Sequence, residues 1–428
     1  MINNKLRLRI LFSTTFFFTA SLGWNSAVKA QNPVRETVGV AVSSDSLISD
    51  QKISKLREKG QAGIEEFMQT YGEELANFSS PALHKVLDKI CQQRDCYSSQ
   101  LYWYTDLESA QAAAQSSGKP ILSLRLLGNL DEDLSCANSR FFRLALYANK
   151  DIAQFLRDRY ILHWESVRPV PTVTVHFGDG RQLKSTLTGN SIHYILNAQG
   201  QPLDALPGLY GPQAFLKQLQ QAEQISQEYN HQASSQQQIF LRQYWRDRLV
   251  TLQNQWSNDL TSLGIETPPL REISEYTEDP NAIDAAPIAM SKMIIETPTL
   301  NILFNNQNLA EITDESTWQK IAQLYSQEAK LDENSIKLIK RKSATVDVAT
   351  ATQKFEELMA LDTVRNEYML RTQVYDWLLN DLSINNLTSL NERVYSQLFL
   401  TPSSDPWLGL FPDDRVTGID NNGVVNFK

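Results

Sequence analysis

Residues 105–127, with the sequence TDLESAQAAAQSSGKPILSLRLL, predict a helix followed directly by a buried strand. Thr105 and Glu108 have the spacing of a capping box, in which two side chains bond to the free N–H groups of the first turn. Gly118 and Pro120 predict the end of this helix, because glycine suits its last turn and proline cannot continue it. The apolar run that follows has the length and composition of a strand buried on both faces.

Alternating strands and helices continue around this stretch, from about residue 101 to residue 222. Cys136 stands at the start of the next predicted helix, which runs on through NKDIAQFLRDRY, and YILHWESV predicts a second strand. Alternating apolar and polar runs separated by glycine-containing turns then predict two β-hairpins, and a last helix follows them. Their positions are 172–188 with a turn at 178–180, 191–206 with a turn at 199–200, and 211–222.

The segments on either side show helical periodicity. Residues 31–100 carry apolar side chains at three-to-four spacing, and SPALHKVLDKIC begins with the serine and proline typical of a helix start. Residues 223–428 have the same periodicity, apart from the loop LTPSSDPWLGLFPDD, which Trp407, Leu408 and Phe411 are expected to pin. The sequence therefore predicts an α-rich α+β protein, with a central α/β domain at 101–222 between an N-terminal helical segment and a C-terminal helical region.

The first thirty residues have the features of an export signal. Three basic residues precede the apolar run ILFSTTFFFTASLGW, and small residues at Val28 and Ala30 mark a cleavage site after Ala30. The run is shorter than the roughly 20 apolar residues of a membrane-spanning helix, and polar side chains interrupt it. We therefore expect a signal peptide at 1–30, export to the periplasm or the extracellular space, and no membrane anchor after cleavage.

The charge of the chain argues against nucleic acid as a partner. It carries 40 Lys and Arg against 49 Asp and Glu, a net charge of −9, and removal of the predicted leader would make it more acidic still. Such a chain has no general attraction for phosphate backbones or anionic membranes. The one dense basic run, KLIKRK at 337–342, is interpreted as a solvated helix face.

Three cysteines are too few to hold an exported fold of this size together. Cys91 and Cys96 lie five residues apart, and in an oxidising compartment they are candidates for a local structural disulfide. Cys136 is then the unpaired cysteine, and an unpaired thiol in an exported chain is a candidate functional group.

The order of elements from 101 to 222 resembles that of the thioredoxin-like superfamily. LESAQAAAQSSGKPILSLRLLG looks like the segment that leads into the central strand of exported thioredoxin-family proteins, and YILNAQGQPLDALPGLYGPQAFLKQL looks like the last hairpin and closing helix. CANSRFFRLALYANKDIAQFLRDRYILHW is similar to the thioredoxin-like domain of spermatogenesis-associated proteins. The resemblance covers about 120 residues, and the hairpin within 170–189 is an insertion into the minimal fold.

Two departures from the family pattern bear on chemistry. The family's CxxC becomes Cys136-Ala137-Asn138-Ser139, so that Ser139 stands where the resemblance places a second, resolving cysteine. Ser191 falls near the position of the family's cis-proline, which packs against the reactive sulfur. Dithiol oxidoreductase chemistry of the usual kind is therefore not expected.

Two interpretations of Cys136 remain. The free N–H groups of a helix start favour a thiolate, Arg140 and Arg143 are close enough in sequence to add positive charge, and the Ser139 hydroxyl could bond to the sulfur. Such a monothiol can attack a disulfide but needs an external thiol to release the product. Alternatively, the cysteine is a small buried side chain, since RFFRLALY immediately after it is strongly apolar.

Three functions follow from these patterns. The first is a non-catalytic or monothiol thioredoxin-like protein of the cell envelope that binds a partner protein or a ligand. The second is thiol–disulfide exchange with partner thiols through Cys136, and the third is a Cys/His metal site with His163, His176 and His193, which lack ligand-pair spacing. No cofactor is expected, because the sequence has no Gly-rich phosphate loop, HExxH or GxSxG.

Overall fold

The computed structural model describes residues 48–265, 315–343, 347–380, 386–408, 418, 419, 421 and 424. The chain in these ranges is mixed α/β and mostly helical, as the sequence predicts. None of the described helices has the length and apolar content that crossing a membrane requires. The predicted leader at 1–30, with its cleavage site after Ala30, lies outside the described residues.

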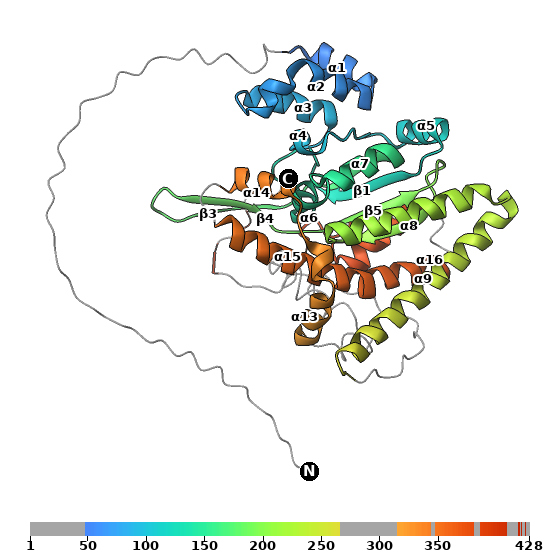
Figure 1. Ribbon diagram of the computed structural model, residues 1–428. Coiled ribbons are helices and arrows are strands. Elements are labelled where there is room, and N and C mark those ends of the chain that lie inside the picture. Colours follow the sequence, from blue (N-terminus) through green and yellow to red (C-terminus); the bar gives the residue numbers. More distant parts are fainter. Residues whose placement is uncertain are drawn as a thin grey trace, which may run out of the picture. The chain divides into compact units, whose positions relative to one another are not determined.

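The chain from residue 48 to residue 99 forms helices (Figure 1). Ser80 caps one of them by accepting a hydrogen bond from the Leu83 amide, and Pro81 is its first residue, which confirms the predicted helix start. Ile64 and Phe67 are buried together with apolar residues of the neighbouring helices. The helices are α1 (Asp50–Glu58), α2 (Gln61–Ala76), α3 (Pro81–Cys91) and α4 (Cys96–Ser99).

Within residues 48–265 the central sheet has four strands in the order β2-β1-β5-β6. Strand β1 pairs parallel to β2 and antiparallel to β5, and β5 pairs antiparallel to β6. Every residue of β1 is buried, as its apolar sequence predicts. The strands are β1 (Ile121–Leu127), β2 (Ile161–Arg168), β5 (Ser191–Leu196) and β6 (Pro202–Pro207).

The helix that leads into β1 is α5 (Leu107–Ser117). It ends at Gly118, which has φ 72° as the predicted glycine stop requires. Its start differs from the prediction, because Asp106 and not Thr105 is the N-cap. The Asp106 carboxylate accepts a hydrogen bond from the Ser109 amide, and a short acidic side chain satisfies a free N–H group at this position well.

Helices cover the sheet and connect its strands. The crossover from β1 to the parallel strand β2 contains α6 (Ala137–Phe141), the π-helical turn η2 (Phe142–Leu146) and α7 (Lys150–Arg159), since parallel strands cannot be joined by a tight turn. Helix α8 (Pro212–His231) follows β6. Both hairpins and the last helix predicted before residue 222 are therefore present. The helix predicted from Cys136 through 160 is instead divided in two, because Asn149 caps a new helix by accepting from the Asp151 and Ile152 amides.

The hairpin predicted at 172–188 is a separate two-stranded ribbon of β3 (Thr172–His176) and β4 (Gln182–Thr186). Gly178 and Gly180, with φ 80° and 90°, form its turn at the predicted place. Figure 1 shows this ribbon extending away from the four-stranded sheet and its helices.

The rest of the described chain is helical. Its buried apolar residues belong to the same cluster as those of the central sheet, whereas the buried residues of α1 to α4 form a second cluster. The elements are α9 (Ser234–Ser262), α13 (Glu315–Leu324), η3 (Ser326–Ala329), α14 (Glu333–Lys342), α15 (Val348–Arg365), η4 (Asn366–Arg371), α16 (Thr372–Asn380), α17 (Leu387–Arg393) and η5 (Val394–Leu398).

A buried ion pair joins β6 to these helices. Arg371 has no exposed side-chain surface, and it donates to Asp204 at 2.7 Å and to Glu367 at 2.8 Å. The Asp204 carboxylate also accepts from the hydroxyls of Tyr244 at 2.6 Å and Tyr375 at 2.7 Å. Burial alone would raise the pKa of Asp204, but Arg371 and these hydroxyls outweigh burial and hold the pKa below its usual value.

Candidate functional site

Cys136 lies at the carboxyl edge of the central sheet, the edge at which open α/β sheets bind ligands. It is the N-cap residue of α6, and its amide donates to the Leu127 carbonyl at the end of β1 at 3.0 Å. The side chain is completely buried, at 0 % exposure, among apolar residues of the large core. The predicted position at a helix start and the predicted burial are both observed, and the reactivity of the thiol stays a prediction.

The sulfur of Cys136 contacts the first residue of β5. Its Sγ atom lies 2.8 Å from the hydroxyl oxygen of Ser191, which is itself fully buried. This contact joins residues 55 positions apart, and it places Ser191 beside the sulfur, where the family resemblance places a cis-proline. The described residues contain no cis peptide bond.

The hydroxyl of Ser139 does not reach the sulfur. It lies 2.6 Å from Ser135 Oγ and 2.9 Å from the carbonyl oxygen of Cys136, and both are hydrogen-bond partners within the same turn. The expected bond from Ser139 to the thiol is therefore wrong, because a hydroxyl in the first turn bonds to nearby groups of its own turn. That Cys136 and Ser139 act in catalysis stays a prediction.

The two arginines that follow the cysteine have different surroundings. Arg140 donates to the Thr186 hydroxyl at 2.9 Å, and burial lowers its pKa while its interaction with Cys136 opposes the shift. Arg143 instead donates to the carbonyl oxygens of Leu130 and Glu132, at 3.0 and 2.6 Å. Of these two arginines, Arg140 is the one whose charge interacts with the thiol, and Arg143 holds the loop that precedes it.

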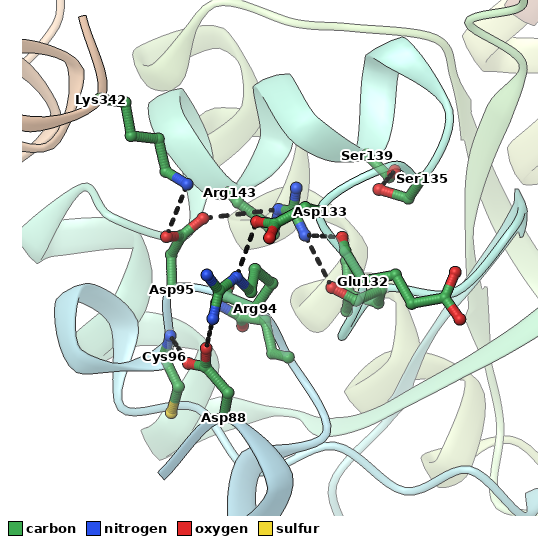
Figure 2. Close-up of polar contacts among 12 residues, drawn as sticks. Asp88, Arg94, Asp95, Cys96, Glu132, Asp133, Ser135, Ser139, Arg143 and Lys342 are labelled. Carbon is green, nitrogen blue, oxygen red and sulfur yellow. Dashed lines mark hydrogen bonds and ion pairs between the residues drawn. The ribbon is translucent and has the colours of Figure 1, made fainter. Parts of the chain in front are cut away.

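The predicted disulfide between Cys91 and Cys96 is present, and a carboxylate fixes the loop that it closes. Asp88 accepts from the Cys96 amide at 2.9 Å and from Arg94 at 2.6 Å (Figure 2). Burial raises the pKa of Asp88, while the Cys96 amide and Arg94 counteract the increase. The disulfide and the Asp88 carboxylate together position Arg94.

This disulfide loop holds the loop that leads to Cys136. Arg94 donates its side chain to Asp133 at 2.7 Å and its amide to the Leu130 carbonyl at 3.0 Å. Asp95 pairs with Lys342 of α14 at 2.8 Å and lies 3.8 Å from Arg143, as Figure 2 shows. The basic run at 337–342 is thus more than a solvated face, because its last lysine binds the disulfide loop.

The C-terminal segment packs over the same edge of the sheet. Arg168, at the end of β2, donates to the carbonyl oxygens of Thr401 at 2.8 Å and Asp405 at 2.9 Å. Asn190, directly before Ser191, donates to the Phe399 carbonyl at 3.2 Å. The loop at 400–408 is therefore fixed to the strands on either side of the cysteine.

Tyr395 extends this cover toward the thiol. Its hydroxyl donates to the Asn190 carbonyl at 3.3 Å, and its pKa is raised by burial first and by Cys136 next. Leu408 is buried as expected, Trp407 is 39 % exposed, and Phe411 lies outside the described residues, so that the pinning of the loop by the two aromatic residues stays a prediction. Hydrogen bonds from Arg168 also hold this loop, because backbone carbonyls of an irregular loop need donors.

The histidines considered as metal ligands do not converge. His163 bonds to Ser123 at 2.9 Å and His193 to the Tyr147 hydroxyl at 2.7 Å, and burial lowers the pKa of each histidine to about 3. They pair with successive residues of β1 and so lie on opposite faces of the sheet, while His176 lies on the exposed ribbon. Within the described ranges, no group of three His, Cys, Asp or Glu residues is arranged to hold a metal ion.

No sequence pattern predicted the hollows of the described residues. An open one of about 360 Å³ lies on α9 and is lined by Thr251, Asn254, Gln255, Asn258 and Asp259. A smaller cavity has a volume of about 50 Å³ and is lined by residues of α8, α9, α15 and η4 together with Tyr325 and Glu328. Ligand pockets usually measure about 300–1,000 Å³, so this cavity suits a few water molecules and not a metabolite.

No family model, no curated protein and no solved structure matches the chain. The features of the molecule that bear on function are the buried cysteine, the loops that hold it and the surface around them.

Proposed function

We propose that the protein is a thioredoxin-like protein of the cell envelope that has lost dithiol catalysis and acts by binding a partner protein or a ligand. Export through the leader at 1–30 is part of this proposal, and the presence of a buried disulfide between Cys91 and Cys96 supports an oxidising compartment.

The order of elements supports the thioredoxin-like part. A helix leads into the central strand β1, Cys136 begins the crossover to the parallel strand β2, and an antiparallel pair, β5 and β6, precedes the closing helix α8. This is the order that the family resemblance implies. The β3–β4 ribbon stands between β2 and β5, as an insertion would.

The observation that most strongly supports the proposed loss of catalysis is the burial of the Cys136 sulfur. Thiol–disulfide exchange requires a thiolate to reach the sulfur of its target, and Cys136 is 0 % exposed. Ser191, Tyr395 and the loop at 400–408 occupy the edge of the sheet from which a protein substrate would approach. The position of the resolving thiol holds Ser139, whose hydroxyl is bonded within its own turn.

Monothiol exchange through Cys136 is the second candidate. The helix-start position of the sulfur and its interaction with Arg140 favour it. In this case the C-terminal segment would have to move before the sulfur could react.

Alkylation of the native, purified mature protein distinguishes the two. Cys136 is the single cysteine outside the disulfide, so labelling by iodoacetamide reports on it directly, and Cys136→Ser is the blank. A binding protein should label only on unfolding in urea, at every pH between 6 and 9. Rapid labelling of the native protein, with an apparent pKa below the roughly 8.5 of a free thiol, would support exchange chemistry instead.

A further inference from the structure

The β3–β4 ribbon has one apolar face and one polar face. Val175 pairs with Leu183, and because side chains alternate along a strand, Val173 and Phe177 lie on the same face as this pair. Ser185 opposite Val173 shares this face, and the Arg181 guanidinium lies 5.4 Å from the centre of the Phe177 ring. The opposite face carries Thr and Gln side chains together with His176 and Lys184, which follow from the same register. A ribbon with this alternation normally buries its apolar face.

The apolar face of this ribbon is instead open. Phe177 is 54 % exposed, Leu183 51 % and Val175 36 %. The ribbon consists of two strands only, so that within the described residues both of its outer edges lack a strand neighbour. An isolated two-stranded ribbon is marginally stable in water, and a third strand is what usually stabilises it.

The charge of the ribbon differs from that of the chain. The chain carries a net charge of −9, whereas Lys184 lies on the polar face of the ribbon and His176 beside it. The only carboxylate of the ribbon, Asp179, is bonded to Arg181 within the turn at 2.8 Å. Salt screens the interaction between exposed charges that lie more than about 8 Å apart. An acidic segment near the ribbon would therefore be attracted by Lys184 more than it is repelled by the acidic residues in the rest of the chain.

We propose that the outer edge of β4 binds an extended segment of a partner protein in which apolar and acidic residues alternate. Such a segment would add a third strand, place its apolar side chains beside Leu183 and its carboxylates beside Lys184, and satisfy the open backbone edge. This inference rests on the proposed binding function and names its surface and partner class.

Two other occupants fit the ribbon less well. Three half-exposed side chains provide much less area than the about 800 Å² per partner that a stable dimer needs, which disfavours a second copy. A lipid surface would leave the backbone groups of both edges without hydrogen-bond partners in hydrocarbon, which is costly. An added strand would cover the apolar side chains and also supply hydrogen-bond partners for the backbone groups of the edge.

A designed probe tests the proposal. We would titrate the mature protein with a short blocked peptide of alternating valine and glutamate, using a fluorescent label for affinity and hydrogen exchange by mass spectrometry for location. We expect saturable binding that slows amide exchange in residues 182–186. Two control peptides, one with lysine in place of glutamate and one with the same residues in two blocks, should bind at least about tenfold more weakly, which is ~1.4 kcal/mol.

Variants connect this binding to the ribbon. Leu183→Thr combined with Val175→Thr keeps strand-forming residues but removes the apolar face, and should weaken binding at least about tenfold. Lys184→Glu should weaken it several-fold and reverse the preference between the acidic and basic peptides. The matched controls are Ile239→Ala and Lys340→Glu, which change an exposed apolar and an exposed basic residue on helices α9 and α14.

Several outcomes would overturn the proposal. They are an absence of peptide-dependent protection at 182–186, equal binding of the block peptide, and unchanged affinity in the ribbon variants. Concentration-dependent dimers that disappear in Leu183→Thr would identify a second copy as the occupant, and ribbon-dependent binding to anionic vesicles would identify a membrane. Alkylation of Cys136 is independent of these variants, so failure of the ribbon proposal and failure of the proposed function are distinguishable.

Discussion

Replacing Arg168 with alanine should expose the sulfur of Cys136 while most of the chain stays folded. Arg168 donates two hydrogen bonds to the C-terminal segment, to the carbonyl oxygens of Thr401 and Asp405 at 2.8 and 2.9 Å. The two accepting residues are more than 230 positions away in the chain, so these bonds hold the segment to the end of β2.

The size of the effect follows from these two bonds. Hydrogen bonds to a charged group contribute about 1.5–3 kcal/mol each when buried, and Arg168 is only half-buried, so we take about 1 kcal/mol for each. The free energy of opening the segment should fall by about 2 kcal/mol. The rate of Cys136 alkylation under native conditions should then rise about 30-fold, if opening and closing are fast compared with labelling.

The assay is alkylation of the native protein at increasing, sub-denaturing urea. Local opening gives a labelling rate that depends little on urea, because it exposes little surface, whereas global unfolding gives a steep dependence. Arg242→Ala is the matched control, since Arg242 also donates to a backbone carbonyl, that of Leu379, at 2.8 Å. The reasoning is refuted if Arg168→Ala labels no faster than Arg242→Ala, or if its labelling rises only with global unfolding.

Three further changes test the remaining contacts. Cys96→Ser removes the Cys91–Cys96 disulfide and should lower the free energy of unfolding by about 2 kcal/mol, the chain-entropy value for so short a loop. A urea midpoint equal to that of the oxidised parent would contradict this expectation. Arg371→Met leaves buried carboxylates without their main cation and should cost about 3–5 kcal/mol in urea unfolding, so a cost under 1 kcal/mol would show that the pair is dispensable. His193 has a folded pKa of about 3 against about 6.5 unfolded, so the unfolded chain takes up the proton first and stability falls as the pH drops below about 6.5. By pH 5 this amounts to about 2 kcal/mol for His193, and His163, whose folded pKa is also about 3, contributes as much. His193→Gln should therefore remove about half of their combined decrease, measured by urea unfolding between pH 7.5 and 5, whereas an unchanged slope would assign the decrease to other groups.

The elements between residues 105 and 222 follow from the sequence because their signals are local. Gly118 ends a helix through its own backbone conformation, and the glycines at 178 and 180 permit a tight turn between alternating runs. The short separation of Cys91 and Cys96 was enough to predict their disulfide. One local error, the cap at Thr105, arose because the capping-box spacing competed with Asp106, a residue that caps equally well.

The surroundings of the candidate site were decided by tertiary structure. The sequence places Cys136 at a helix start, but its burial depends on distant residues such as Ser191, whose hydroxyl oxygen lies 2.8 Å from the sulfur, and Tyr395, whose hydroxyl donates to the Asn190 carbonyl. The buried pair of Asp204 and Arg371 joins residues 167 positions apart and left no pattern in either local sequence. Periodicity and capping patterns indicate the conformation of the backbone within a few turns. The burial of a side chain depends instead on which distant segment packs over it, and only the folded chain brings those segments together.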